Sequence, residues 1–346
     1  MLKKILRALN LIKESKFDLL FYKILTKFGF KNILPPLPKW LIIEPISLCN
    51  LRCSTCPTGL GKTKRLKPSM TFDEFKKIID EVRGYVGKVV LFNYGEPFLN
   101  KELLKMIKYA VEADIRVKVS TNGHFFNDEK FCEEVVKSGL QHLIIALDGT
   151  DQETVEKTRP GANFSSIVQG FQNIRDAKRK LNSRLPKLEL QFIIMRHNES
   201  QKEKMKEFAK EWGVDVYTEK AVGLYNNDPE FNKVAEELLP NNLSSSRYYK
   251  NSAGNYELKG NMSNHCNIVM GATVINSDGN VVPCCYDEDC EHVMGNVFAT
   301  SLKSIWQGKK YNNFRDAIKK NRKAISICNT CSEGRYEGVV NKQKLD

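Results

Sequence analysis

The sequence predicts an α/β fold, in which helices cover a parallel sheet, followed by a small α+β domain. Between residues 40 and 219, six short apolar segments are separated by five amphipathic ones, a pattern typical of βα units that form a parallel sheet. A proline-rich run at 35–38 separates this region from the preceding chain. The ten cysteines gather at 49–56 and 266–331, with only Cys132 between them. We therefore expect an N-terminal segment (1–39), a partial (β/α)6 barrel (40–219), a linker or substrate-facing loop (220–265) and a C-terminal domain (266–335).

The N-terminal segment is basic and amphipathic. Residues 1–34 hold eight Lys and Arg against two acidic residues, with apolar residues at helical spacing. Such a segment suits an anionic membrane surface; the alternative is a helical pair packed on the catalytic domain. Charges interrupt every apolar run of this segment, so the segment is not a signal peptide. None of its apolar runs approaches the ~18 residues that a membrane span needs. We expect a cytoplasmic protein, soluble or peripheral at the membrane.

The elements of the barrel follow from apolar periodicity and turn residues. The helix expected at 71–86 starts with Thr71 and Glu74, the pattern of a capping box. Active sites of such barrels lie at the carboxyl ends of the strands, so the residues that follow each strand are candidates for function. The expected strands are 40–46, 88–93, 115–120, 142–147, 187–195 and 215–219, and the expected helices are 71–86, 101–113, 128–138, 164–182 and 201–212.

Cys49, Cys53 and Cys56 form a C-x3-C-x2-C loop directly after the first expected strand. A cubane iron–sulfur cluster normally takes four thiolates, so three would leave one iron open to a small molecule. A zinc site is the alternative, because C-x2-C pairs are common zinc ligands, but no second pair follows nearby. A disulfide is disfavoured, since paired thiols stay reduced in a chain of cytosolic character.

This loop resembles that of the radical S-adenosylmethionine (SAM) superfamily, whose usual architecture is the open (β/α)6 barrel and whose open iron chelates SAM. The resemblance implies a SAM-binding [4Fe–4S] cluster and reductive cleavage of SAM to a 5′-deoxyadenosyl radical that abstracts hydrogen from a substrate. It also implies a reducing partner such as flavodoxin or ferredoxin. Thr55 departs from the family, which often has a bulky residue before the third cysteine; this should affect the potential rather than the identity of the cluster.

Residues after the later strands agree with this resemblance. The run Tyr94-Gly95-Glu96-Pro97 resembles the Gly-Gly-Glu-Pro motif that holds the SAM amino group, with Tyr94 at the first glycine. Ser120 and Asn122 belong to a Ser-Thr-Asn-Gly segment whose polar groups approach SAM in the family.

Two further residues match the family at later positions. Asp148 is implied as a partner of the ribose or of a substrate hydroxyl, and Arg159 as a partner of the SAM carboxylate. The alternatives are a plain Asp-Gly or Asn-Gly turn and, for Arg159, a surface ion pair. No catalytic base is assigned.

A second cysteine pattern lies in the C-terminal region, where twelve residues separate Cys266 from Gly279 and four more separate Gly279 from Cys284. Cys328 and Cys331 follow as a C-x2-C pair, and we expect a hairpin at 272–283 and a helix at 301–320. The whole arrangement resembles SPASM and twitch domains. The cysteine run that a two-cluster SPASM domain needs is absent. The resemblance implies a twitch (half-SPASM) domain with one auxiliary [4Fe–4S] cluster, whose ligands we define as the auxiliary cysteines: Cys266, Cys284, Cys328 and Cys331.

Other uses of these cysteines stay open. Cys285 is an alternative ligand to Cys284, and a structural zinc ribbon is the alternative to a cluster. Cys290 and Cys132 are expected to be ordinary thiols.

The resemblance implies an enzyme that oxidises or epimerises a sugar, polyol or lipid-linked small molecule. A peptide maturase is the alternative, but those enzymes often carry a peptide-recognition module of domain size, and only 39 residues precede the first expected strand. A non-catalytic iron–sulfur or zinc protein is the alternative of another class, which SAM binding would separate from both. The net charge of +13 suits an anionic substrate or membrane; nucleic acid is not expected, since no separate basic domain with interleaved aromatics is present.

Overall fold

The computed structural model describes residues 21–22, 24–25, 27, 35–63, 65–224, 230–335 and 338–345 of the 346-residue chain. The basic segment expected at 1–34 lies almost wholly outside the described residues, so its role stays a prediction. Among the described helices, none is long and apolar enough to cross a membrane.

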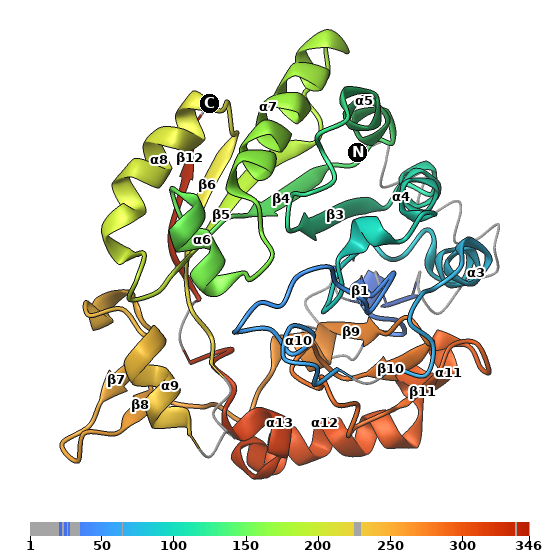
Figure 1. Ribbon diagram of the computed structural model, residues 1–346. Helices are drawn as coiled ribbons and strands as arrows, with labels where there is room; N and C mark the ends of the chain where they lie inside the picture. Colours follow the sequence, from blue (N-terminus) through green and yellow to red (C-terminus); the bar gives the residue numbers. More distant parts are fainter. Residues whose placement is uncertain are drawn as a thin grey trace.

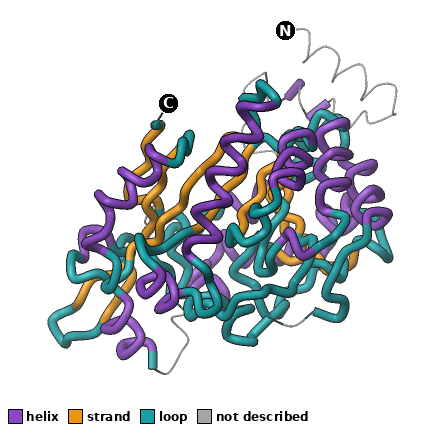
Figure 2. The backbone as a smooth tube through the Cα atoms, turned by 45° about the horizontal axis from the view of Figure 1, so that its top comes forward, coloured by secondary structure: helices purple, strands orange, loops and turns teal. Residues whose placement is uncertain are grey.

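One sheet organises the described part of the chain, with its ten strands in the order β11-β10-β9-β1-β2-β3-β4-β5-β6-β12. Strands β1 to β6 are parallel neighbours, and helices α3 to α8 lie over the outer face of the curved sheet (Figure 1 and Figure 2). This confirms the predicted α/β partial barrel. The strands are β1 (Trp40–Ile43), β2 (Lys88–Val90), β3 (Arg116–Thr121), β4 (His142–Ala146), β5 (Lys187–Ile194) and β6 (Val216–Ala221). The helices are α3 (Phe72–Val82), α4 (Leu103–Glu112), α5 (Glu129–Lys137), α6 (Gln152–Thr158), α7 (Phe164–Lys180) and α8 (Lys202–Glu211).

Successive side chains of each strand point alternately to the helix-covered core and to the barrel interior. On β3, Val117 and Val119 are buried in the main core, whereas Lys118 between them lies on the opposite face. Helix α3 starts with the predicted capping box, in which Thr71 and Glu74 bond each other's backbone. Helix α6 was not expected, and the side chain of Asp151 caps its first turn by accepting the N–H of Thr154.

The C-terminal hairpin continues the barrel sheet instead of forming a sheet of its own. Strand β9 (Ala272–Ile275) pairs in parallel with β1, and β10 (Asn280–Val282) returns antiparallel, followed by β11 (Gly295–Asn296). Gly279 in the turn has φ +83°, and a Cβ there would meet the Phe298 ring at 2.5 Å. The turn therefore requires glycine.

Helices complete this C-terminal region. They are α10 (Asn267–Gly271), α11 (Leu302–Gln307), α12 (Lys309–Asn321) and α13 (Ser326–Asn329). The single helix expected at 301–320 is divided in two, because Gly308 adopts an extended conformation (ψ 160°) between α11 and α12.

Residues 220–265, expected as a linker or loop, contain regular structure: helix α9 (Phe231–Leu238) and the hairpin β7 (Tyr248–Lys250) and β8 (Tyr256–Leu258). A small core of their own joins these elements to the residues after β5 and β6; it consists of Met195, Val222, Ala235, Leu239, Tyr248 and Tyr256. Strand β12 (Val339–Lys344) pairs antiparallel with β6 and ends the sheet. Its polar sequence gives no strand signal, which is common for an edge strand.

Candidate active site

The loop after β1, residues 49–56, is called here the cluster loop. It presents the thiols of Cys49, Cys53 and Cys56, all partly buried. The N–H of Cys56 donates to the carbonyl of Cys53 (3.2 Å), and the N–H of Ser54 donates to the carbonyl of Thr158 (3.1 Å). The structure thus brings the three predicted ligands onto one loop, held in place by the last residue of α6.

Gly95 and Glu96 order the loop that follows β2. A Cβ on Gly95 would lie 1.9 Å from the carbonyl oxygen of Ile46, so only glycine fits. The buried Glu96 carboxylate accepts from Thr121 Oγ1 (2.8 Å) and from the N–H groups of Asn122 (2.8 Å) and Phe98 (3.1 Å). Burial raises the pKa of Glu96 to about 7 although these hydrogen bonds lower it. Glu96 therefore ties the end of β2 to the end of β3.

The end of β3 reaches the cluster loop through Asn122. Its side-chain nitrogen donates to Asn50 Oδ1 (2.8 Å) and lies 4.0 Å from Cys49 Sγ. Ser120 lies two residues earlier on the same face of the strand. Both predicted residues are thus at the carboxyl edge of the sheet, where the thiols lie.

Asp148 and Arg159 form a buried ion pair beside the thiols. Arg159 Nη2 lies 2.7 Å from Asp148 Oδ2, and the two side chains are 12% and 0% exposed. The surface ion pair considered for Arg159 is therefore wrong. Asp148 Oδ1 also accepts the N–H of Ile193 (2.8 Å). Burial raises the pKa of Cys53 to about 11, with the charge of Arg159 opposing it, so a cation already stands beside a sulfur that a cluster would make anionic.

The auxiliary cysteines are all buried and share a buried arginine. Arg322 is 1% exposed, and its Nη2 donates to Cys331 Sγ (3.6 Å) and to the carbonyl of Glu333 (3.0 Å). Burial alone would lower the pKa of Arg322, but the neighbouring Cys266, Cys331 and Cys328 raise it. Among the described residues, no carboxylate forms an ion pair with Arg322.

These surroundings fit clusters at both cysteine groups. A cube held by four thiolates is anionic, and Arg322 supplies a buried cation that lacks a described carboxylate partner. Among the described residues, no three Cys, His, Asp or Glu side chains converge tightly enough to share one ion. In a cluster each thiolate binds a different iron, so its ligands stand further apart than those of a single zinc.

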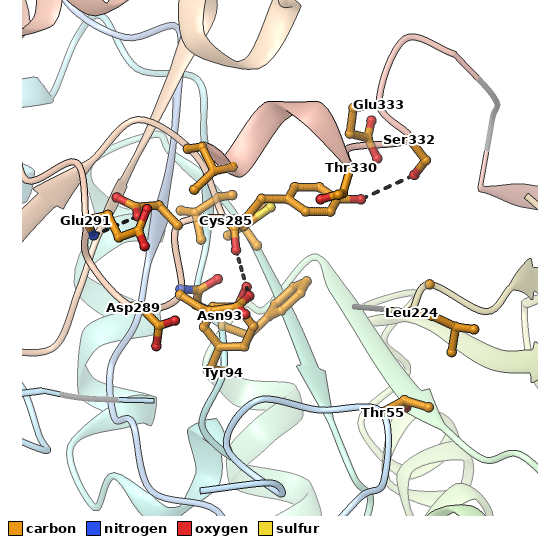
Figure 3. A pocket seen from close by; sticks show the side chains of 18 of the residues that line it. Thr55, Asn93, Tyr94, Leu224, Cys285, Asp289, Glu291, Thr330, Ser332 and Glu333 are labelled. Carbon is orange, nitrogen blue, oxygen red and sulfur yellow. Dashed lines mark hydrogen bonds between the residues drawn. The ribbon is translucent and has the colours of Figure 1, made fainter. Parts of the chain in front are cut away.

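A cavity of about 560 Å³ lies between the cluster loop and the C-terminal domain. Thr55 of the cluster loop lines it from one side, and Cys285, next to Cys284, lines it from the other. Figure 3 shows Tyr94 directed at Cys285, with its hydroxyl donating to the Cys285 carbonyl. Tyr94, which replaces the first glycine of the family motif, therefore bridges the barrel and the C-terminal domain. Cys285 exposes a face to the cavity, whereas Cys284 is 6% exposed, which keeps Cys284 the better candidate ligand.

Glu44 and Arg65 were missed in the sequence. Glu44 is fully buried one residue after β1, 2.9 Å from Arg65 Nε, and it accepts the N–H groups of Tyr94 (3.4 Å) and Ser277 (3.3 Å). It thereby links the loop after β2 to the turn between β9 and β10. A carboxylate directly after an apolar strand was the available signal, because a buried charge requires partners.

Comparison with known proteins gives two family matches. Residues 43–208 match the radical SAM superfamily, and residues 266–332 match the iron–sulfur cluster-binding domain called SPASM.

Similar curated proteins include the AdoMet-dependent heme synthase of Methanosarcina barkeri, 29% identical over 52% of this chain and 49% of that protein. The S-adenosyl-L-methionine-dependent 2-deoxy-scyllo-inosamine dehydrogenase of Niallia circulans is 22% identical over 84% of this chain and 91% of its own. The chain spans half or less of the first curated relatives that it matches.

Among solved structures, BtrN in complex with AdoMet and 2-DOIA has a TM-score of 0.53 at 21% identity, covering 88% of this chain and 99% of that one. Streptococcus suis SuiB bound to S-adenosylmethionine has a TM-score of 0.65 at 16% identity, covering 91% and 76%. At these identities the likeness shows the fold.

Proposed function

Because the chain belongs to the radical SAM superfamily and carries a C-terminal iron–sulfur cluster-binding domain, we propose that it oxidises a small molecule between two clusters. Membership of this enzyme superfamily removes the non-catalytic alternative. In the proposed reaction, the 5′-deoxyadenosyl radical would take a hydrogen atom from a carbinol carbon of a sugar, polyol or lipid-linked substrate. The hydroxyl would lose its proton to a base or to water, and the remaining electron would pass to the auxiliary cluster as the carbonyl forms.

The observation that carries this proposal is the single cavity lined by both Thr55 and Cys285. A substrate in it would touch the cluster loop on one side and the residue next to an auxiliary ligand on the other. Such a placement suits an oxidation in which the substrate loses a hydrogen atom beside the cluster loop and an electron beside the auxiliary cysteines.

The roles of the residues follow from their positions. Cys49, Cys53 and Cys56 would hold the first cluster, and the auxiliary cysteines the second. When bound, the reduced first cluster supplies the electron that cleaves SAM to methionine and a 5′-deoxyadenosyl radical. We assign the residues at the strand ends that match the family motifs to SAM binding: Tyr94, Gly95, Glu96, Pro97, Ser120, Asn122, Asp148 and Arg159. Glu96 and Asp148 already accept internal hydrogen bonds, so they also fix the positions of their neighbours.

Two observations support a small molecule over a peptide. The cavity volume of about 560 Å³ lies within the range of small-molecule sites. The similar dehydrogenase of Niallia circulans aligns over most of both chains. The SuiB fold, also found bound to the precursor peptide SuiA, keeps a peptide maturase as the second candidate.

Hydrogen transfer into 5′-deoxyadenosine tests the proposal. The anaerobically reconstituted enzyme, reduced by dithionite and supplied with SAM, should release 5′-deoxyadenosine. A deuterated cell extract, divided into metabolite and peptide fractions, should then give deuterated 5′-deoxyadenosine from the metabolite fraction alone. Deuterium from the peptide fraction would favour a maturase, and no 5′-deoxyadenosine under any condition would refute the proposed function.

A further inference from the structure

The inner face of the barrel carries lysines that the proposed chemistry does not use. Lys88 on β2 and Lys118 on β3 line the cavity. Lys220 on β6 and Lys342 on β12 lie close enough to act electrostatically on Lys118. Four cations from four strands therefore face a shared interior.

Their charges are crowded and partly removed from water. The pKa of Lys118 falls to about 8, because burial disfavours its ammonium and the charges of Lys220, Lys342 and Lys88 repel it. Burial also lowers the pKa of Lys220, and Arg247 and Lys342 act in the same direction. The ammonium groups therefore destabilise one another in the free protein.

Glu189 acts on Lys118 and Lys220, and Glu333 acts on Lys220, but Glu189 already has partners. Glu189 Oε2 lies 2.7 Å from His142 Nε2 and 3.1 Å from Lys342 Nζ. Within the described ranges, no ion pair joins a carboxylate to Lys88, Lys118 or Lys220. Lys88 Nζ instead lies over the Trp40 ring, 4.4 Å from its centroid. On this wall of the cavity, Lys88 and Lys118 thus have no ion-pair partner within the described part of the chain.

The facing wall has the opposite charge. Residues 287–291 of the C-terminal domain add carboxylates to the cavity lining, and Figure 3 shows Asp289 and Glu291 there. Glu291 accepts a hydrogen bond from Ser326 Oγ (2.9 Å), and Asp287 accepts the N–H groups of Glu291 and His292. An anion is repelled from this wall and attracted to the strands.

We infer that the substrate carries an anionic group, a phosphate or a carboxylate, which binds Lys118 and Lys88 on the inner face of the barrel. Ammonium groups bind such anions through charge-assisted hydrogen bonds, and the anion would relieve the repulsion among the lysines. The acidic wall would fix the direction in which the remainder of the molecule extends. This inference rests on the proposed function, because it assigns the same cavity to the substrate.

Pyridoxal 5′-phosphate probes the site directly. Its aldehyde condenses with a neutral lysine amine to an imine with loss of water, and added borohydride reduces the C=N bond to a stable amine that mass mapping locates. In the SAM-loaded holoenzyme, Lys118 should be labelled, and inorganic pyrophosphate should protect it. Pyridoxal, which lacks the phosphate, should label Lys118 about tenfold less, since one charge-assisted contact is lost. Equal labelling by both reagents would overturn the inference.

Calorimetric titration with pyrophosphate and with malonate then separates phosphate from carboxylate recognition. Lys118→Met and Lys88→Met should each weaken binding about tenfold, whereas Lys118→Arg should retain it. Lys137→Met, on the exposed face of α5, is the matched control and should bind as the wild type does. Iron content and circular dichroism report folding of each variant. The anion site would be refuted if both Met variants bound the anions as tightly as the wild type, or if the wild type bound neither anion. The release of 5′-deoxyadenosine by the wild type tests the proposed function separately.

Discussion

Replacing Arg322 with methionine should lower the reduction potential of the auxiliary cluster. Arg322 is buried beside three of the auxiliary cysteines, and its guanidinium also donates to the carbonyl of His265 (3.0 Å). A cation in this position favours the cluster state that holds one more electron. The Arg322→Met variant loses that preference but keeps much of the side-chain volume.

The size of the shift follows from the distance. Arg322 Nη2 lies 3.6 Å from Cys331 Sγ, and unit charges about 4 Å apart interact by about 4 kcal/mol at an effective dielectric constant of about 20. For a one-electron couple, about 1.4 kcal/mol corresponds to about 59 mV, so the upper limit is about 170 mV. The added electron is spread over the cluster, so we expect a drop of about 50–150 mV.

A redox titration followed by electron paramagnetic resonance measures this shift. The cysteines of the cluster loop are first replaced with alanine, so that only the auxiliary cluster contributes to the spectrum. Arg322→Lys keeps the charge and should remain within about 30 mV of the parent. Arg315→Met is the matched control, because Arg315, on α12, is also buried but stacks on Trp306, 4.0 Å from its centroid. An unchanged potential in Arg322→Met, or an equal drop in Arg315→Met, would contradict the reasoning.

Four further outcomes follow from the same structure. Alanine at all three cysteines of the cluster loop should remove about four irons per chain and abolish 5′-deoxyadenosine formation; undiminished formation would disprove a SAM-cleaving cluster there. The Cys328/Cys331 double alanine variant should keep about four of about eight irons and still release 5′-deoxyadenosine while losing substrate turnover, whereas stoichiometric zinc in the wild type would contradict an auxiliary cluster. Sulfate, whose charge is constant from pH 7 to 9, should bind about tenfold more weakly at pH 9, because Lys118 loses its proton as the pH rises through its pKa of about 8; a flat profile would count against Lys118. If residues 1–34 anchor the protein at a membrane, salt should weaken its sedimentation with anionic vesicles, and equal sedimentation with neutral vesicles would favour the packing role.

The barrel could be predicted because its signals are local. Apolar runs of four to eight residues gave each parallel strand to within a few residues, since both faces of such strands are largely buried. The capping box of Thr71 and Glu74 marked the start of α3. The candidate site followed from the same logic, because the carboxyl ends of parallel strands meet at one edge, and the structure does bring Glu96 and Asn122 together there.

The features that were missed depend on contacts between distant parts of the chain. The pairing of β12 with β6 joins residues more than a hundred positions apart, and the sequence of β12 contains no apolar alternation. Arg322 gains its importance only from what surrounds it after folding, and the sequence marks Glu44 as a buried charge without showing which distant residues it joins. A lysine within an apolar strand, such as Lys118, is expected to face solvent from the sequence alone. Only the curvature of the folded sheet shows that it is enclosed.

The register of β9 explains how one sheet separates two clusters while serving both. Because β9 runs parallel to β1, with Ile275 beside Ile43, the turn after β9 lies at the end of the sheet that carries the cluster loop. Strand β10 then runs back, with Val282 beside Val274, so Cys284, two residues later, lies towards the opposite end. At about 3.3 Å per residue, the intervening strand spans about 10 Å. A substrate in the cavity beside β1 and β2 would then lose a hydrogen atom at one end and an electron at the other, so the extension of the sheet by β9 is itself part of the proposed chemistry.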